Sequence, residues 1–107
     1  MHNADVSCKM KIPKNIQEKA IDLTSIGLNE VAWQKGDALL LLDYFDTNSV
    51  FVLGGDVLTL QDGTYQHNYD NWFFEKNEGN AKDSVQKAKI YISDYPEGNY
   101  VFVIVSE

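Results

Sequence analysis

Two short segments contain the residue types that could carry out chemistry: Leu53–Val57, which reads Leu-Gly-Gly-Asp-Val, and His67–Asp70. Adjacent glycines beside an acid resemble the start of a phosphate-binding loop. Such a loop requires a following Gly-Lys-Ser or Gly-Lys-Thr and a helix, because the free N–H groups at the helix N-terminus bind the anion. Here a strand-like segment follows the glycines, and no such lysine is present. We therefore exclude a phosphate-binding loop.

A carboxylate site is a second chemical interpretation of these residues. If Asp62 and Gly63 form a two-residue turn, Asp56 falls opposite about residue 69, which brings it near Asp70, with His67 close by. Carboxylate groups bind Mg²⁺ or Ca²⁺ in many proteins, and a His–Asp pair can activate a hydroxyl for hydrolysis. The sequence contains no nucleophile motif. The alternative function is therefore a small-ligand or metal-binding domain, or an enzyme, with a carboxylate pocket around Asp56, His67 and Asp70.

The same glycines also have a purely architectural explanation. Gly54 and Gly55 predict a bulge or sharp bend at which another backbone approaches closely. Asp56 would then accept hydrogen bonds from backbone N–H groups and lock the bend. Together with the turn pair Asp62 and Gly63, these residues form the predicted structural motif of the chain.

The segment that follows is unusually aromatic. Four of the six residues 69–74 are aromatic, namely Tyr69, Trp72, Phe73 and Phe74. They cannot all face one side of a strand, so some must be exposed. Exposed Tyr and Trp beside Asp and Asn are typical of a binding anchor with a polar rim. A second small core between the sheet and a helix is an equally good explanation.

Apolar periodicity predicts three helices, over residues 14–25, from Asp37 onward, and over residues 81–95. The first has a proline at its start and a glycine, Gly27, just after its end. The second has an inward stripe of Leu39, Leu42 and Phe45. The third ends where a proline and a glycine follow it.

Strands are expected at residues 49–53, in a hairpin over residues 57–68, and at residues 99–105. In the hairpin, one face should be more buried than the other. The last segment is almost wholly apolar, which is typical of a strand in the centre of a sheet. The fold class is therefore α+β, with a small, mainly antiparallel sheet of about four strands and about three helices packed on one face.

Composition sets the remaining expectations. With 107 residues, a single domain over residues 1–107 is expected, with residues 1–12 as a loosely attached lead-in. The net charge of −7 and the absence of arginine argue against direct nucleic-acid binding. No apolar run approaches the roughly 20 residues of a membrane span, and the N-terminus lacks the apolar core of a signal peptide. With Cys8 as the single cysteine, a cytoplasmic location without membrane contact is expected.

Three segments, in their order along the chain, resemble the bacterial family called immunity protein 40. They are Leu53–Val57, Tyr69–Trp72 with the sequence Tyr-Asp-Asn-Trp, and Ala88–Tyr95 with the pattern Ala-x-x-Tyr-Ile-x-x-Tyr before a last strand. The resemblance covers residues 37–105. Leu58 departs from the tyrosine that the family often has after Gly-Gly-Asp-Val. The segment before residue 37 is only loosely similar, so nothing about it is inferred from the family.

The resemblance implies a protein of a polymorphic or contact-dependent toxin system that binds and neutralises its cognate toxin domain. It implies no enzymatic activity and no cofactor. An acidic chain would complement a basic toxin, for example a nuclease, and would associate with it rapidly. The residues that we expect to contact the toxin are Asp56, Tyr69, Asp70, Asn71, Trp72 and Glu75.

Overall fold

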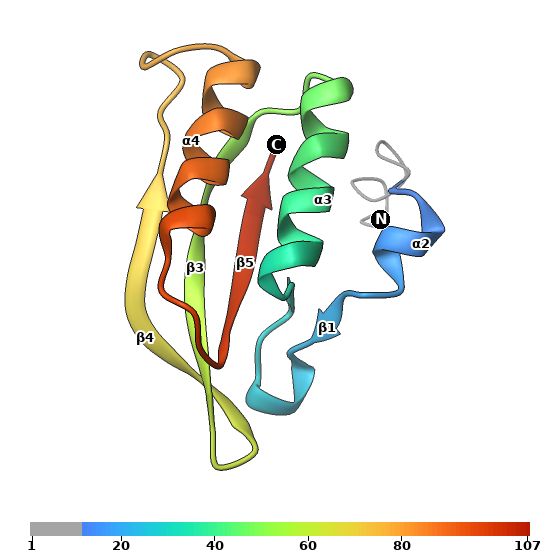
Figure 1. Ribbon diagram of the computed structural model, residues 1–107, viewed down its shortest axis with the longest axis vertical. Coiled ribbons are helices and arrows are strands. Elements are labelled where there is room, and N and C mark those ends of the chain that lie inside the picture. The colour runs from blue at the N-terminus through green and yellow to red at the C-terminus, as the bar shows by residue number, and fades with distance from the viewer. Residues whose placement is uncertain (1–11) are drawn as a thin grey trace.

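The computed structural model describes residues 12–107, and the structural statements below concern these residues. Its main sheet has the strand order β4-β3-β5, formed by β3 (Val52–Gln61), β4 (Thr64–Phe73) and β5 (Tyr100–Ser106), all antiparallel (Figure 1). A separate two-stranded ribbon pairs β1 (Ile21–Asp22) with β2 (Val31–Ala32). The predicted α+β class is confirmed, with five strands instead of about four.

Two helices lie side by side on one face of the main sheet (Figure 1). They are α3 (Lys35–Thr47) and α4 (Ala81–Asp94). The helix α3 begins two residues before its predicted start at Asp37. The second begins with a capping box. The side chain of Asn80 accepts a hydrogen bond from the backbone N–H of Asp83, and the side chain of Asp83 accepts one from the backbone N–H of Asn80. Both predicted helices are therefore confirmed.

The apolar faces of these helices form the larger core with the sheet. Buried residues from α3, α4, β3 and β5 include Leu42, Phe45, Val57, Ile92 and Phe102. Of the predicted inward stripe, Leu42 and Phe45 are buried, whereas Leu39 only packs against the edge of this core. Ala38 and Leu41 complete the buried face of α3.

A second core covers the opposite face of the sheet. Leu58, Val101 and Val103 pack there against Leu23 and Ala32 from the N-terminal segment. Because both faces of β3 are covered, Val57 and Leu58 are both fully buried. The expectation that one face of this strand would be more buried is therefore wrong at its centre, and exposed residues occur only near its two ends, at Leu53 and at Leu60 and Gln61.

The helix predicted over residues 14–25 is wrong beyond its first turn. The helix α2 covers only Lys14–Gln17, and the chain then forms β1 and the short 3-10 helix η1 (Thr24–Ile26). The reason is that Ile16 belongs to the core beneath the helices, whereas Leu23 belongs to the core on the other face. A single helix cannot deliver these two side chains to opposite sides of one sheet.

The last strand, β5, is not central. It lies at an edge of the three-stranded sheet, and its outer side makes one isolated bridge between Phe102 and Trp33. Its apolar sequence reflects burial of both faces, since Phe102 packs under the helices and Val101 and Val103 pack on the other side. The central strand is β3, which continues through the glycines where two separate strands were expected.

The hairpin is confirmed at its turn. Gln61 pairs with Thr64, and both turn residues have positive φ, 53° at Asp62 and 77° at Gly63. Positive φ at both central positions is the signature of a type I′ turn. The expected irregularity near the glycines is also present, because the β3–β5 register shifts between Val52 and Gly54.

Candidate functional site

A bulge in β4 dominates the outer edge of the sheet. Opposite the single residue Val57, β4 has three residues, Asn68, Tyr69 and Asp70, because Leu58 pairs with His67 and Asp56 pairs with Asn71. Tyr69 at the centre has a φ of 69° and is 88% exposed. The backbone N–H of Asp70 donates to Oδ1 of Asn68 at 3.0 Å, which closes the bulge as a local turn.

The bulge sets the position of Trp72. A regular ladder from the turn would place Trp72 opposite Leu53, but the two extra residues of β4 place it opposite Gly55. A Cβ on Gly55 would lie 2.6 Å from Cζ3 of the indole, and it would also collide with the carbonyl oxygen of Val103. A Cβ on Gly54 would lie 2.9 Å from Cα of Phe73. The glycines are therefore required by close packing on both sides of β3.

Trp72 is architectural. It is 5% exposed, and its indole stacks on Tyr91 of α4 with ring centroids 4.8 Å apart. Its Nε1 is buried and finds no hydrogen-bond acceptor among the described residues. Trp72 was expected to contact a toxin, and its burial removes it from the accessible surface. Phe73, which is not among the expected toxin contacts, is 61% exposed.

Asp70 is held in a hydrogen-bonded chain that links β4 to the end of α4. The Tyr95 hydroxyl donates to Oδ2 of Asp70 at 2.7 Å, and Nδ2 of Asn68 donates to the Tyr95 oxygen at 2.9 Å. Burial, followed by the hydrogen bond to Asp70, raises the pKa of Tyr95 to about 12. Burial, followed by the charges of Asp70 and Asp56, also raises the pKa of Tyr91. The negative field of these carboxylates therefore reaches α4.

The carboxylate pocket considered as an alternative is not assembled. Asp56 and Asn71 line a small hollow of about 240 Å³, which neither His67 nor Asp70 reaches. His67 instead stacks beside Tyr69, with ring centroids 6.5 Å apart. Across residues 12–107, no group of three His, Cys, Asp or Glu side chains is placed to hold a metal ion.

The proposed role of Asp56 as a lock is not found either. Its carboxylate accepts no hydrogen bond from any other residue within the described part of the chain. Close packing explains the two glycines, since a Cβ would meet the backbone of β4 at Gly54 and the Trp72 ring and the backbone of β5 at Gly55. Asp56 is half-buried between its partners Asn71 and Val103.

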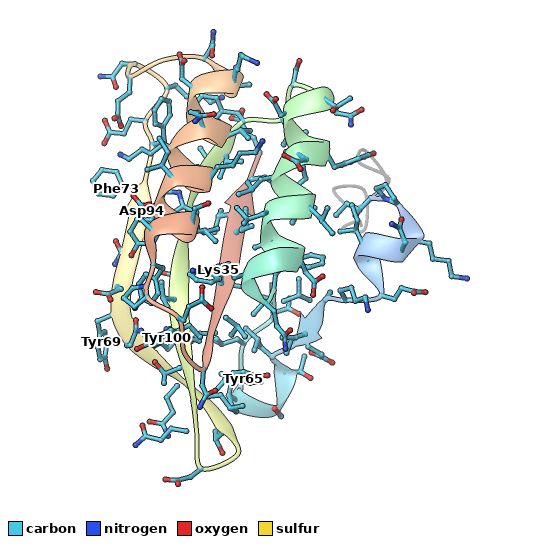
Figure 2. All side chains as sticks on the ribbon, viewed as in Figure 1. Lys35, Tyr65, Tyr69, Phe73, Asp94 and Tyr100 are labelled. Atoms are coloured by element: carbon cyan, nitrogen blue, oxygen red, sulfur yellow. The ribbon has the colours of Figure 1, made fainter. Side chains whose placement is uncertain are left out.

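A groove of about 700 Å³ runs between α4 and the β4 bulge. Its walls are mainly apolar, and its lining residues come from β4, α4 and the segment after α4: Asp70, Lys87, Ile90, Tyr91, Asp94, Tyr95 and Pro96. Figure 2 shows Tyr69 and Phe73 on the outer side of β4, with Asp94 on α4 along the same side of the molecule. No sequence pattern indicates this groove, because it depends on how α4 lies beside the bulge.

Exposed acids and aromatics continue along β4 and beyond it. Tyr69, Asp70 and Asn71 are exposed, and so is Glu75 in the loop after β4, where its backbone N–H donates to Glu78 at 2.7 Å. Of the residues expected to contact a toxin, these four are accessible together on one strand and its following loop. Asp56 is partly accessible.

A second hollow, of about 350 Å³, lies beneath the start of α3. Its cation, Lys35, is already occupied, because Nζ donates to the carbonyl oxygen of Tyr95 at 2.6 Å and contacts Glu97 at 3.0 Å (Figure 2). Lys35 therefore joins α3 to the C-terminal end of α4 and does not offer a free charge to a ligand.

Comparison with known proteins identifies a family. The model of the family described as immunity protein 40 matches residues 22–106 of the chain. No curated protein and no solved structure is significantly similar to it. Over residues 12–107, no helix is long and apolar enough to cross a membrane. The family match extends upstream of residue 37, where the resemblance begins, and it includes the β1–β2 ribbon except for Ile21.

Proposed function

The chain belongs to the immunity protein 40 family, and from this premise we propose that it binds and neutralises a cognate bacterial toxin domain. The mechanism is stoichiometric protein–protein inhibition, so it needs neither catalysis nor a cofactor. The whole chain acts as one domain in the cytoplasm of the producing cell, as part of a polymorphic or contact-dependent toxin system. Family membership supports this role.

The β4 bulge is the proposed centre of the toxin-binding surface, and the backbone of Tyr69 is the observation that carries this assignment. A tyrosine at positive φ costs about 1–3 kcal/mol and persists only where the surrounding structure enforces it. Here the strain holds an aromatic side chain 88% exposed, between the acid Asp70 and the amide Asn71. An exposed aromatic ring with a polar rim is a typical interface anchor.

The partner recognises side chains at this edge, not backbone. β4 is an edge strand, and such strands can pair with another chain. In the bulge and at the end of β4, however, side chains already bond to backbone carbonyl groups: the carbonyl oxygen of Tyr69 accepts from Asn71 at 3.4 Å, and that of Phe73 accepts from Lys87 at 2.8 Å. Strand addition would have to break these bonds.

The contacts that we propose are therefore Tyr69, Asp70, Asn71 and Glu75, joined by Phe73 and with Asp56 at the margin. The net charge of −7 favours a basic partner such as a nuclease, because opposite charge accelerates association. Trp72 contributes by holding the bulge against α4 and does not touch the toxin.

Growth protection in cells tests this proposal. The chain is co-expressed with the toxin domain encoded beside it, as the wild type and as the variants Tyr69→Gly and Asp62→Asn. Tyr69→Gly relieves the strained backbone and removes the ring, so we expect an unchanged or higher unfolding midpoint together with weaker protection. Asp62→Asn removes one surface charge at the hairpin tip and keeps a residue that suits the type I′ turn, so it should protect fully. Full protection by Tyr69→Gly would refute the proposed surface.

A further inference from the structure

Asp94 is the last residue of α4, and its charge opposes the helix. A helix C-terminus carries a partial negative charge, so basic side chains are favoured there and acids are not. The last turn of α4 contains no basic residue. Asp94 is exposed, and within the described part of the chain no residue hydrogen-bonds or ion-pairs with its carboxylate. The folded state therefore gains nothing from this charge.

Asp94 differs from the other acids of the two helices. Asp37 lies in the first turn of α3, where the helix dipole favours an acid, and Asp83 accepts a hydrogen bond from the backbone N–H of Asn80. Asp43 of α3 contacts Lys89 of α4, and Asp46 contacts Lys82 at 3.8 Å. A residue that is unfavourable for stability and has no internal partner suggests a role outside the folded chain.

Asp94 also lines the groove between α4 and the β4 bulge, together with Asp70. The wall next to these carboxylates is apolar and includes Ile90, which is 53% exposed. Lys87 is the one base that lines the groove, and it is engaged elsewhere: Nζ donates to the carbonyl oxygen of Phe73 and lies 3.8 Å from Glu78. The raised pKa of Tyr91, due after burial to Asp70 and Asp56, agrees with a negative potential here.

We propose that this groove binds a lysine or arginine side chain from the surface of the toxin domain. The aliphatic stem lies along Ile90, Tyr91 and Tyr95, and the cation lies against the carboxylates of Asp70 and Asp94. This inference rests on the proposed function and names the chemistry that the site recognises. The groove is large enough to take the side chain together with part of the segment that carries it.

Only a basic side chain suits both the apolar wall of the groove and its two carboxylates. A purely aliphatic group would cover Ile90 but would strip water from two carboxylates without replacing it, which is unfavourable. An acidic group would be repelled by the same carboxylates. Lys and Arg combine a long apolar stem with a charged head, so the stem can cover the apolar wall while the head reaches the acids.

The test measures the affinity of purified variants for the toxin domain encoded beside this chain, at low and at physiological salt. Asp94→Asn is matched by Asp62→Asn, which makes the same change of charge at the hairpin tip. Ile90→Gln on α4 is matched by Leu40→Gln on α3, since both side chains are 53% exposed in the middle of a helix. The unfolding midpoint of each variant is measured in parallel.

We expect Asp94→Asn to weaken binding by about tenfold or more, to reduce the salt dependence, and to raise the unfolding midpoint. Ile90→Gln should weaken binding by a similar factor, and the two control variants should bind like the wild type. Loss of affinity together with a gain in stability is a combination that a purely structural role for Asp94 cannot produce.

The outcomes separate this inference from the proposed function. If the wild type binds the toxin domain but Asp94→Asn and Ile90→Gln bind as tightly as their controls, the groove assignment is overturned and the proposed function stands. If the wild type does not bind at all, the proposed function fails and this inference fails with it.

Discussion

Substitution of Gly55 by alanine should destabilise the fold strongly, because β3 has no room for a side chain at this position. The new Cβ would lie 2.6 Å from Cζ3 of Trp72 and closer still to the carbonyl oxygen of Val103. Trp72 is packed against Tyr91, and the carbonyl of Val103 belongs to the strand that pairs with β3. Neither neighbour can move without loosening the contact between α4 and the sheet or the β3–β5 ladder.

The expected loss of unfolding free energy in Gly55→Ala lies at the upper end of the range for overpacked cores. Extra methylene groups in a well-packed core typically cost about 1–3 kcal/mol. Because two rigid neighbours are displaced, we expect about 3 kcal/mol or more for Gly55→Ala, from a total stability of about 5–15 kcal/mol. With a urea m-value of about 1–3 kcal/mol/M, the unfolding midpoint should fall by about 1 M or more.

Gly36→Ala is the matched control. Gly36 lies in the first turn of α3, and a Cβ there would meet no atom within 4 Å. The same chemical change should therefore stabilise the fold by about 0.4–1 kcal/mol, through the lower entropy of the unfolded chain. Urea unfolding followed by the fluorescence of the buried tryptophans measures both variants. Equal midpoints for Gly55→Ala and the wild type would refute the packing argument.

Three further predictions concern the elements that hold the site. Ser84→Ala should cost about 1–3 kcal/mol, because the Ser84 hydroxyl accepts from the buried backbone N–H of Val52 at 2.9 Å, whereas the exposed Ser93→Ala should be nearly neutral in the same urea assay. Asn80→Ala removes the N-cap of α4 and should cost about 1 kcal/mol of unfolding free energy, measured by circular dichroism. The pKa of Tyr95 is raised to about 12, so the stability that comes from its neutral hydroxyl is complete below about pH 10 and is lost as the pH rises from 10 through 12. Ultraviolet titration should show late-ionising tyrosines, and the component near pH 12 should disappear in Tyr95→Phe; an unchanged titration curve in that variant would contradict the assignment.

Much of the architecture could be predicted because local chemistry determines it. The Asp62–Gly63 turn requires positive φ at two adjacent residues, and few residue pairs besides Asp-Gly supply it so readily. Residues 81–94 form a helix because their apolar side chains recur on one face and a capping box precedes them. These features depend on neighbours in the sequence and need no knowledge of the tertiary fold.

The sequence-based predictions were wrong where tertiary packing determines the secondary structure and the strand order. Ile16 and Leu23 fit the spacing of one helix, but they belong to cores on opposite faces of the sheet, and periodicity does not distinguish two apolar environments. The strand β5 is apolar for the same reason, since both of its faces are covered although it lies at an edge of the sheet.

The candidate site could be predicted only in part. Tyr69, Asp70 and Asn71 are predicted contacts, and all three are exposed, as a contact residue must be. The bulge that moves Trp72 over Gly55 could not be foreseen, because an insertion in a strand leaves no mark on the alternation of side chains when it adds two residues. Leu53–Val57 and the Tyr-Asp-Asn-Trp segment would lie opposite each other without the bulge as well, but the two extra residues shift their pairing, so that Trp72 falls opposite Gly55 and Asn71 opposite Asp56.

The most direct test of the proposed function is a binding titration between the purified chain and the C-terminal domain encoded by the gene immediately upstream. We predict a one-to-one complex with nanomolar affinity, which weakens as salt concentration rises. Absence of binding at micromolar concentrations of both proteins would contradict the claim that this protein neutralises a toxin by capturing it.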